Sequence, residues 1–288
     1  MIPVKSFIRI NKILLIFDVK NVIIICMSDL TIYSLKDFSG LRKAGRLAAE
    51  TLDYITPFVK PGVSTEALDD LMDEFIKKNG GRTACRGYHG YPKCTCISPN
   101  HVICHGIPSA DKILKSGDII NIDVTVIVNG WYGDTSRMYY VGKPSVKAKR
   151  LVETTYQTMM AGIQQAGPNK TTGDIGAVME ELANSAGFST VHDYCGHGIG
   201  RVFHGAPNVL NYGVRGKGIK LVPGLVFTVE PMVNTGSGDT LTLQDGWTTV
   251  TRDKGLSAQF EHTIGITEDG YEIFTLSPKG YTYPPYQD

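Results

Sequence analysis

Five side chains of the kinds that bind metal ions follow one another along the second half of the 288-residue chain. They are Asp123, Asp134, His197, Glu230 and Glu261. Three of the acids stand in the apolar, β-branched stretches NIDVTVI, FTVEPMV and AQFEHTIGI, which have the composition of buried strands. A buried carboxylate is strongly destabilising unless a cation or dense hydrogen bonding compensates it. The pattern therefore favours bound metal over a set of hydrogen-bonded polar residues in the core.

Four carboxylates and one imidazole form a hard, oxygen-rich ligand set. One divalent ion would leave surplus negative charge, whereas two divalent ions balance four carboxylates. Two such ions about 3.5–4 Å apart, bridged by hydroxide, provide a nucleophile at neutral pH and polarise a carbonyl group. The ligand types suit Co, Mn, Fe or Zn, because Cu prefers more nitrogen ligands. We expect two divalent ions per chain, and the sequence does not choose among these metals.

Two further histidines have the surroundings expected of substrate-binding residues. His105 and His204 lie in the His-Gly turns of ICHGIP and FHGAP, outside the predicted strands. A solvated loop histidine is the alternative for each of them. His89 and His192 have weaker contexts and are assigned to the structural residues. The chain shows no Ser or Cys nucleophile with a paired base.

An internal repeat accounts for the elements that carry these residues. A shift of 107 positions places the helical apolar pattern of residues 65–76 on that of residues 172–183. Each predicted helix begins at a Ser or Thr and ends at glycine. An earlier helix is expected in each half, at 38–59 and at 147–166. The same shift places SGDIINID on PGLVFTVE, and therefore Asp123 on Glu230.

The repeat predicts an α+β fold made of two halves related by pseudo-twofold symmetry. Helices should lie outside and an antiparallel sheet inside, so that each half brings a pair of acids to a shared axis. We expect a single catalytic domain over residues 28–288, with halves at about 28–142 and 143–280. Residues 234–257 form an insert in the second half and should make a longer excursion near the site.

The register of one hairpin follows from its turn. The Asn-Gly pair at 129–130 is a strong signal for a two-residue type I′ turn. This turn places Asp134 opposite Thr125, on the same face as Asp123. The two carboxylates should therefore lie diagonally across the hairpin, with backbones about 7 Å apart.

Composition excludes several other classes. With a net charge of +1 and no long basic run, nucleic acid is not expected as a main partner. The six cysteines contain no C-x-x-C pair, so we expect reduced core thiols in a cytosolic protein. Residues 1–27 form a leader whose apolar runs are too short and interrupted for a spanning helix. Translation is expected to start at Met27, and a targeting or anchor segment is the alternative.

These residues, in this order, closely resemble type I methionine aminopeptidases, metal-dependent exopeptidases of the pita-bread (creatinase/aminopeptidase) fold. The resemblance covers about residues 30–280. The matching motifs are AGRLAAETL, VKPGVST, CHGIP, NIDVT, GDTSRM, GHGIG, FHGAP, TVEPM and QFEHT. Neither the N-terminal zinc-binding extension of eukaryotic type I enzymes nor the helical insert of type II enzymes is present, which implies the bacterial type.

The resemblance implies a role for each candidate metal ligand. Asp123 and Asp134 would bind metal, with Asp134 and Glu261 bridging the two ions. His197 and Glu230 would be ligands of one ion, and Glu230 would also handle protons during the attack. His197 is the one ligand without a counterpart in the repeat, so the two ions should not be equivalent.

The resemblance also implies how substrate is bound. His105 would contact the substrate near its amino end, and His204 would stabilise the tetrahedral intermediate. The pocket for the methionine side chain would be lined by Tyr88, Tyr91, Cys96, Phe203 and Trp247.

The implied activity is removal of the N-terminal methionine from nascent proteins whose second residue is small. The implied setting is a monomer in the cytoplasm, in transient contact with the ribosome. A prolidase or Xaa-Pro aminopeptidase of the same fold is the nearest alternative. A pita-bread protein that has lost catalysis and serves as a binding module is the other.

Overall fold

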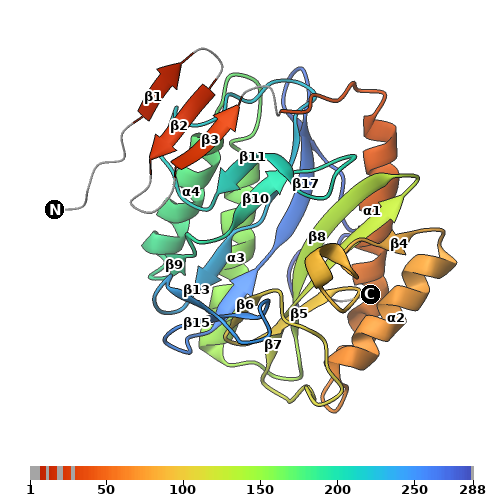
Figure 1. The fold of residues 1–288 in the computed structure, drawn as a ribbon. Coiled ribbons are helices and arrows are strands. Elements are labelled where there is room, and N and C mark those ends of the chain that lie inside the picture. Colours follow the sequence, from red (N-terminus) through yellow and green to blue (C-terminus); the bar gives the residue numbers. More distant parts are fainter. Residues whose placement is uncertain (1–6, 11–12, 18–21, 27–29, 287–288) are drawn as a thin grey trace.

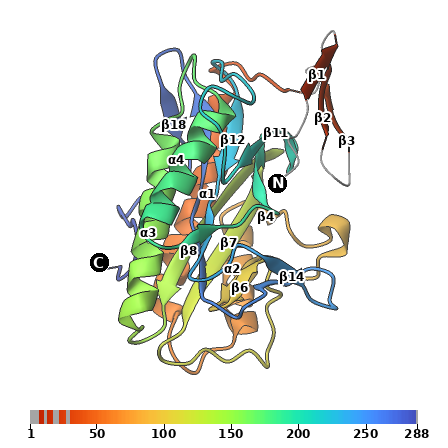
Figure 2. The same cartoon turned by 90° about the vertical axis from the view of Figure 1, so that its left-hand side faces the viewer.

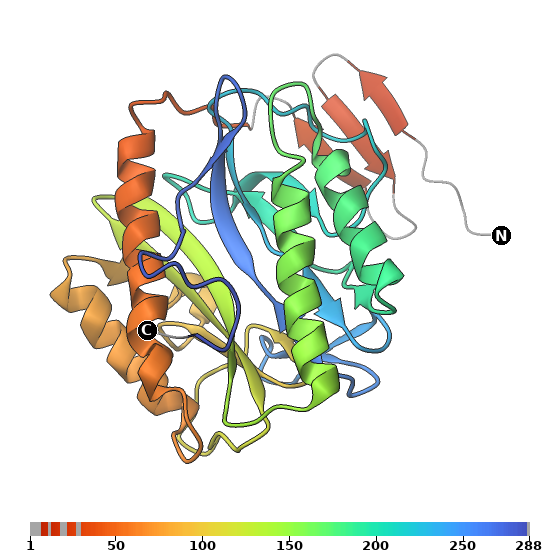
Figure 3. The same cartoon turned by 180° about the vertical axis from the view of Figure 1, so that it is seen from behind.

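The computed structural model describes residues 7–10, 13–17, 22–26 and 30–286. A large sheet forms the centre of the molecule, and helices lie outside it (Figure 1). The helices are α1 (Phe38–Ile55), α2 (Thr65–Lys78), α3 (Val146–Ile163) and α4 (Thr172–Ser185), with short 3-10 turns η2 (Thr56–Phe58) and η3 (Tyr88–Gly90). Viewed from the side and from behind, α1 and α3 cover the same face of the sheet (Figures 2 and 3).

The nine-stranded sheet has the order β11-β10-β12-β17-β8-β7-β4, with β5 paired to β7 and β18 to β17. All of its pairs are antiparallel. Its strands are β4 (Arg82–Thr83), β5 (Cys96–Pro99), β7 (Ile119–Val128), β8 (Trp131–Tyr140), β10 (Cys195–Gly198), β11 (Gly205–Leu210), β12 (Val226–Val229), β17 (Glu261–Ile266) and β18 (Tyr271–Ile273). Strand β17 pairs with β12 of its own half and with β8 of the first half, and so joins the halves.

Three smaller sheets complete the strand pairing. The insert at 234–257 contains a hairpin of β14 and β15, and β15 pairs with β6 from the first half. The elements of these sheets are β6 (Val102–Cys104), β9 (Ser189–Thr190), β13 (Met232–Asn234), β14 (Thr240–Thr242), β15 (Thr249–Thr251) and β16 (Ser257–Gln259), and near the N-terminus β1 (Phe7–Ile10), β2 (Ile13–Phe17) and β3 (Val22–Cys26). The other residues of the predicted leader lie outside the described ranges. Within those ranges, no helix combines the length and apolar character needed to cross a membrane.

The repeat seen in the sequence is present in the backbone. The isolated bridge between Ser64 and Ile113 recurs between Thr171 and Lys220, 107 positions later at both residues. Ser64 and Thr171 also cap α2 and α4, because each hydroxyl accepts a hydrogen bond from the backbone N–H three residues on. The predicted duplication is confirmed at the level of individual hydrogen bonds.

The hairpin of β7 and β8 has the predicted register. Thr125 is paired with Asp134 across the two strands. Asn129 and Gly130 have φ angles of 50° and 74°, as a type I′ turn requires. Because side chains alternate along a strand, Asp123 and Asp134 project from the same face of the sheet.

A buried ion pair lies on the opposite, helix-covered face. The guanidinium of Arg137 contacts the carboxylate of Asp53 on α1, and their side chains are 2% and 6% exposed. Ser277 donates to the same carboxylate, and the hydroxyl of Tyr286 donates to the carbonyl of Met138 at 2.7 Å. The C-terminal segment therefore crosses the back of the sheet between α1 and α3 (Figure 3).

Candidate metal centre and substrate pocket

The strands bring all five predicted metal ligands to one pocket of about 590 Å³. Asp123 comes from β7, Asp134 from β8 and His197 from β10. Glu230 follows directly after β12, and Glu261 is the first residue of β17. The pocket therefore sits across the junction of the two halves, as the repeat predicts.

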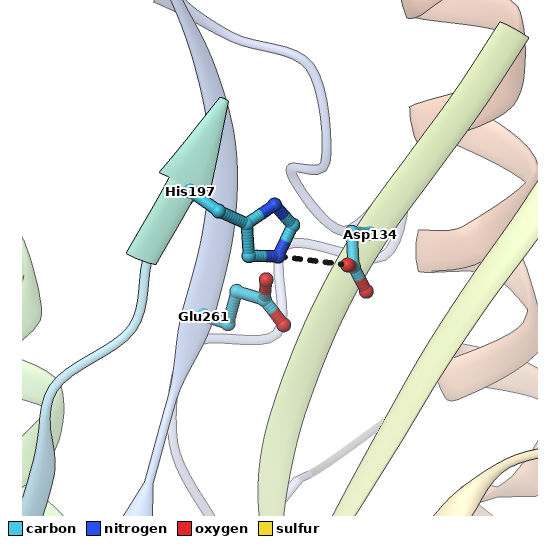
Figure 4. A group of neighbouring side chains, drawn as sticks. All are labelled: Asp134, His197 and Glu261. Carbon is cyan, nitrogen blue, oxygen red and sulfur yellow. Dashed lines mark ion pairs between the residues drawn. The ribbon is translucent and has the colours of Figure 1, made fainter. Parts of the chain in front are cut away.

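The ligand-type atoms of Asp134, His197 and Glu261 all lie within 4.8 Å of one another (Figure 4). Nε2 of His197 is 3.6 Å from Oδ2 of Asp134 and 3.6 Å from Oε1 of Glu230. Oδ1 of Asp123 is buried without a hydrogen-bond partner among the described residues. A buried carboxylate oxygen without a partner is costly, and a cation would compensate it. The donor set therefore fits a divalent metal ion.

Neighbouring side chains fix the orientation of Glu230. The hydroxyl of Thr228 donates to Oε1 at 2.7 Å and accepts from the backbone N–H of His197 at 2.9 Å. The amide of Gln259 donates to Oε2 at 3.2 Å. Such partners hold candidate ligands in place before a metal binds. Neither Thr228 nor Gln259 was expected from the sequence, although each is a polar residue two positions before an acid, Glu230 or Glu261.

Burial disfavours the charged forms of all five residues. It raises the pKa of Asp123 to about 7 and that of Glu230 to about 8. Burial, followed by repulsion from neighbouring carboxylates, also raises the pKa values of Asp134 and Glu261. Burial lowers the pKa of His197 to about 4. Without a cation, the carboxyl groups therefore hold protons that a bound cation would displace.

An aromatic wall adjoins the cluster. Tyr91 meets Trp247 edge-on at 5.2 Å between ring centroids, and Phe203 lies 4.7 Å from Tyr88. Trp247 comes from the insert, which reaches the site as predicted. The pocket contains every residue predicted to bind substrate, namely Tyr88, Tyr91, Cys96, His105, Phe203, His204 and Trp247.

The pocket also contains residues that the sequence analysis did not select. The main ones are Cys85, His89, Asp193, Tyr194 and Met232. Cys85, His89, Asp193 and Tyr194 lie in none of the motifs quoted above, and Met232, although part of TVEPM, has no chemical feature that marks it from the sequence. His89, assigned above to the structural residues, thus belongs to the pocket wall, whereas His192 stacks on Tyr212 at 4.0 Å, outside this pocket.

The two remaining predicted histidines flank the cluster. His204 lies near the mouth of the pocket, with its ring centroid 4.2 Å from that of His197. Loss of water around the ring lowers the pKa of His204 to about 3, and His197 adds to the effect. Burial also lowers the pKa of His105. Both rings are therefore neutral at pH 7.

Comparison with known proteins identifies the family. The sequence model of metallopeptidase family M24 matches residues 39–268. The chain belongs to metallopeptidase family M24. Among its relatives, the methionine aminopeptidase of Rickettsia prowazekii is 59% identical over 256 residues, covering 88% of this chain and 98% of the relative. The methionine aminopeptidase of Escherichia coli K12 is 50% identical over 242 residues, covering 84% and 92%.

Solved structures agree with the family assignment. The crystal structure of the Rickettsia prowazekii methionine aminopeptidase matches with a TM-score of 0.85 and 57% identity, covering 86% of this chain and all of that one. This match confirms the predicted pita-bread fold. In a metallopeptidase of family M24, the cluster of carboxylates and histidine indicates divalent metal binding.

Proposed function

We propose that this M24 family member removes the N-terminal methionine from nascent proteins and peptides whose second residue is small. The observation that carries the proposal is the position of the carboxylate–histidine cluster beside an aromatic, cysteine-containing pocket. A thioether packs well against aromatic rings, which suits such a pocket to a methionine side chain. The names of the relatives at 50–59% identity support the same activity.

The five clustered residues would hold two divalent ions, because two ions balance four carboxylates. Such ions would polarise the scissile carbonyl and lower the pKa of a water molecule. Asp134 and Glu261 place ligand atoms within 4.8 Å of each other and of His197, and by the family resemblance these two carboxylates would be shared by both ions. The donor types suit Co, Mn, Fe or Zn.

The chain's own side chains would handle protons and charge. Glu230 is held at both oxygens by Thr228 and Gln259, and its raised pKa suits it to accept a proton and pass it to the leaving amine. His204 would donate to the oxygen of the tetrahedral intermediate. His105, 6.1 Å from Trp247 between ring centroids, would contact the substrate near its amino end.

The proposed substrates indicate where the protein acts and what else it contacts. Nascent N-termini emerge at the ribosome, so we extend the proposal to a monomer that contacts the ribosome transiently in the cytoplasm. The five cysteines whose side chains the structure describes are free thiols, which suits a reducing compartment. We expect no sequence-specific contact with nucleic acid.

Peptide turnover tests the activity. We expect the protein to release methionine from Met-Ala-Ser, to lose this activity on chelation, and to recover it with added Mn, Fe or Co. Release of the first residue should be monitored by chromatography. A peptide of the Xaa-Pro class and Met-Leu-Ser should be assayed in parallel as comparison substrates. Preferred cleavage of the Xaa-Pro peptide would place the chain with the prolidases instead. Full activity in protein shown by elemental analysis to be metal-free would contradict the mechanism.

Replacing His204 with alanine tests the role of this histidine. We expect kcat for Met-Ala-Ser to fall about 10²–10³-fold, because removing one oxyanion donor costs about 2.7–4 kcal/mol. KM should change far less. His192→Ala is the matched control, because His192 lies outside the pocket. A kcat for His204→Ala near that of the control would remove His204 from the mechanism.

A further inference from the structure

The ring of His204 is anchored by one hydrogen bond at the mouth of the pocket. Its Nδ1 atom lies 2.9 Å from the hydroxyl of Tyr88. Tyr88 belongs to the first half of the chain, and His204 to the second, 116 residues later. Among the described residues, no other side chain hydrogen-bonds to this imidazole. The contact therefore fixes which ring nitrogen remains free.

Tyr88 stands on a constrained turn. Gly87 has a φ angle of 86°, which favours glycine, and its N–H donates to the carbonyl of Tyr91 at 2.8 Å. The N–H of Tyr88 donates to the carbonyl of Cys85 at 3.0 Å. The ring of Phe203 packs against Tyr88 on the side of His204. The phenol is thus held against the imidazole by backbone and packing together.

The identity of the free nitrogen matters for catalysis. A neutral imidazole donates from one nitrogen and accepts at the other. If the Tyr88 hydroxyl donates to Nδ1, the proton of His204 resides on Nε2, where it can be donated to a developing oxyanion. In the opposite tautomer, Nδ1–H would point to Tyr88, and Nε2 would present a lone pair to negative charge.

We propose that Tyr88 is a positioning residue that donates its hydroxyl hydrogen to Nδ1 of His204 and so holds the proton of this imidazole on Nε2. The catalytic role of Nε2–H rests on the proposed function. The hydrogen bond between Tyr88 and His204 does not depend on it. It gives Tyr88 a task beyond lining the methionine pocket: the polar end of the side chain serves catalysis, while the ring serves binding.

The chain offers a matched control. The Tyr132 ring stacks on Phe203 at 5.7 Å and 21°, so Tyr132 belongs to the same aromatic group as Tyr88. Its hydroxyl has no contact with His204 among the hydrogen bonds of the described residues. Tyr88→Phe and Tyr132→Phe remove the same atom from neighbouring rings, and only the first removes the hydrogen bond.

The tautomer is measured by nitrogen-15 NMR of the histidine side chains. The protein is labelled at histidine and loaded with Zn²⁺, which is diamagnetic, and His204→Gln identifies the signals. We expect Nε2 of His204 to be protonated and Nδ1 to be unprotonated, with the Nδ1 resonance shifted by a hydrogen bond. Tyr88→Phe should remove that shift and admit the second tautomer, whereas Tyr132→Phe should preserve the wild-type spectrum. Protonated Nδ1 in the wild type, or an unchanged spectrum in Tyr88→Phe, would overturn the proposal.

Kinetics provide the second readout. Loss of one such hydrogen bond should lower kcat for Met-Ala-Ser about tenfold, with KM changed less than about threefold. Tyr132→Phe should retain wild-type kcat. A fall confined to KM would reduce Tyr88 to a pocket residue and overturn the positioning role. The NMR result needs no turnover, so failure of the wild type to release methionine would refute the proposed function alone.

Discussion

Replacing Asp134 with asparagine is expected to abolish methionine release while leaving the fold intact. Asp134 contributes to the cluster with His197 and Glu261, and its Oδ1 accepts from the hydroxyl of Thr125 at 2.7 Å. The amide keeps the shape of the side chain but removes the charge that balances a cation. Loss of several kcal/mol of metal-derived stabilisation corresponds to about 10³-fold or more in rate. Turnover of Met-Ala-Ser and metal content by elemental analysis would be measured on the same samples.

In metal-free protein, the same substitution should not lower the free energy of unfolding, although it abolishes activity in metal-loaded protein. Burial and repulsion disfavour the charged form of Asp134, and the neutral amide removes this repulsion. At pH 8 we therefore expect metal-free Asp134→Asn to be at least as stable to urea as the metal-free wild type. Asp269→Asn, in the exposed turn between β17 and β18, is the control and should match the wild type in activity and metal content. Full activity in Asp134→Asn would exclude this residue as a ligand.

The pH dependence of the free energy of unfolding tests the raised pKa values of Asp123 and Glu230. Folded Asp123 and Glu230 hold protons up to pH values of about 7 and 8, whereas unfolded carboxyl groups release them near pH 4. Above the ordinary histidine pKa of about 6.5, the folded state therefore binds more protons than the unfolded state. The free energy of unfolding of metal-free wild type should thus fall as pH rises from 6.5 to 8. Saturating metal should remove this slope, because it displaces the protons.

Breaking the buried ion pair behind the sheet should cost about 3–5 kcal/mol of the free energy of unfolding. Asp53→Leu leaves the guanidinium of Arg137 buried without its carboxylate partner. It also removes the acceptor of the Ser277 hydroxyl and so loosens the C-terminal segment. Urea unfolding of metal-saturated protein, followed by circular dichroism, would measure the loss.

A double variant shows how much of the lost stability comes from the unpaired charge of Arg137. Asp53→Leu combined with Arg137→Met replaces both charges by apolar groups, which is often neutral or stabilising. We expect the double variant to recover most of the stability lost by Asp53→Leu. Because Arg137 and Asp134 project from opposite faces of β8, the double variant should retain peptide turnover. A loss under 1 kcal/mol in the single variant, or no recovery in the double variant, would contradict this account.

The sequence predicted those parts of the fold that local chemistry determines. The Asn-Gly turn at 129–130 set the pairing of Thr125 with Asp134, because a two-residue turn leaves one register. A Ser or Thr was expected near the start of each helix: Ser64 caps α2, and α4 is capped by Thr171, one residue before the expected Thr172. The predicted end of the first helix, residue 59, was too late: α1 ends at Ile55 and continues as the 3-10 turn η2, since Pro57 removes a backbone donor.

Contacts between segments far apart in the chain could not be predicted from the sequence. Asp123, Glu230 and Glu261 could be selected from the sequence because carboxylates are exceptional in apolar strands. Thr228 and Gln259 are ordinary polar residues whose importance lies in what they touch. The pairing of Asp53 with Arg137 joins residues 84 positions apart and has no periodic signal. The hydrogen bond between Tyr88 and His204 likewise depends on how two loops meet.

The position of β17 has a consequence for the order in which the protein is made. This strand lies between β12 and β8, yet it is followed in the sequence only by β18 and the C-terminal segment. While the chain is being synthesised, β8 and β12 have no neighbour on their inner edges until residues 261–266 have left the ribosome. Long-range pairing of this kind slows folding. Glu261 is carried by the same strand, so the metal site is completed only when the two halves have closed.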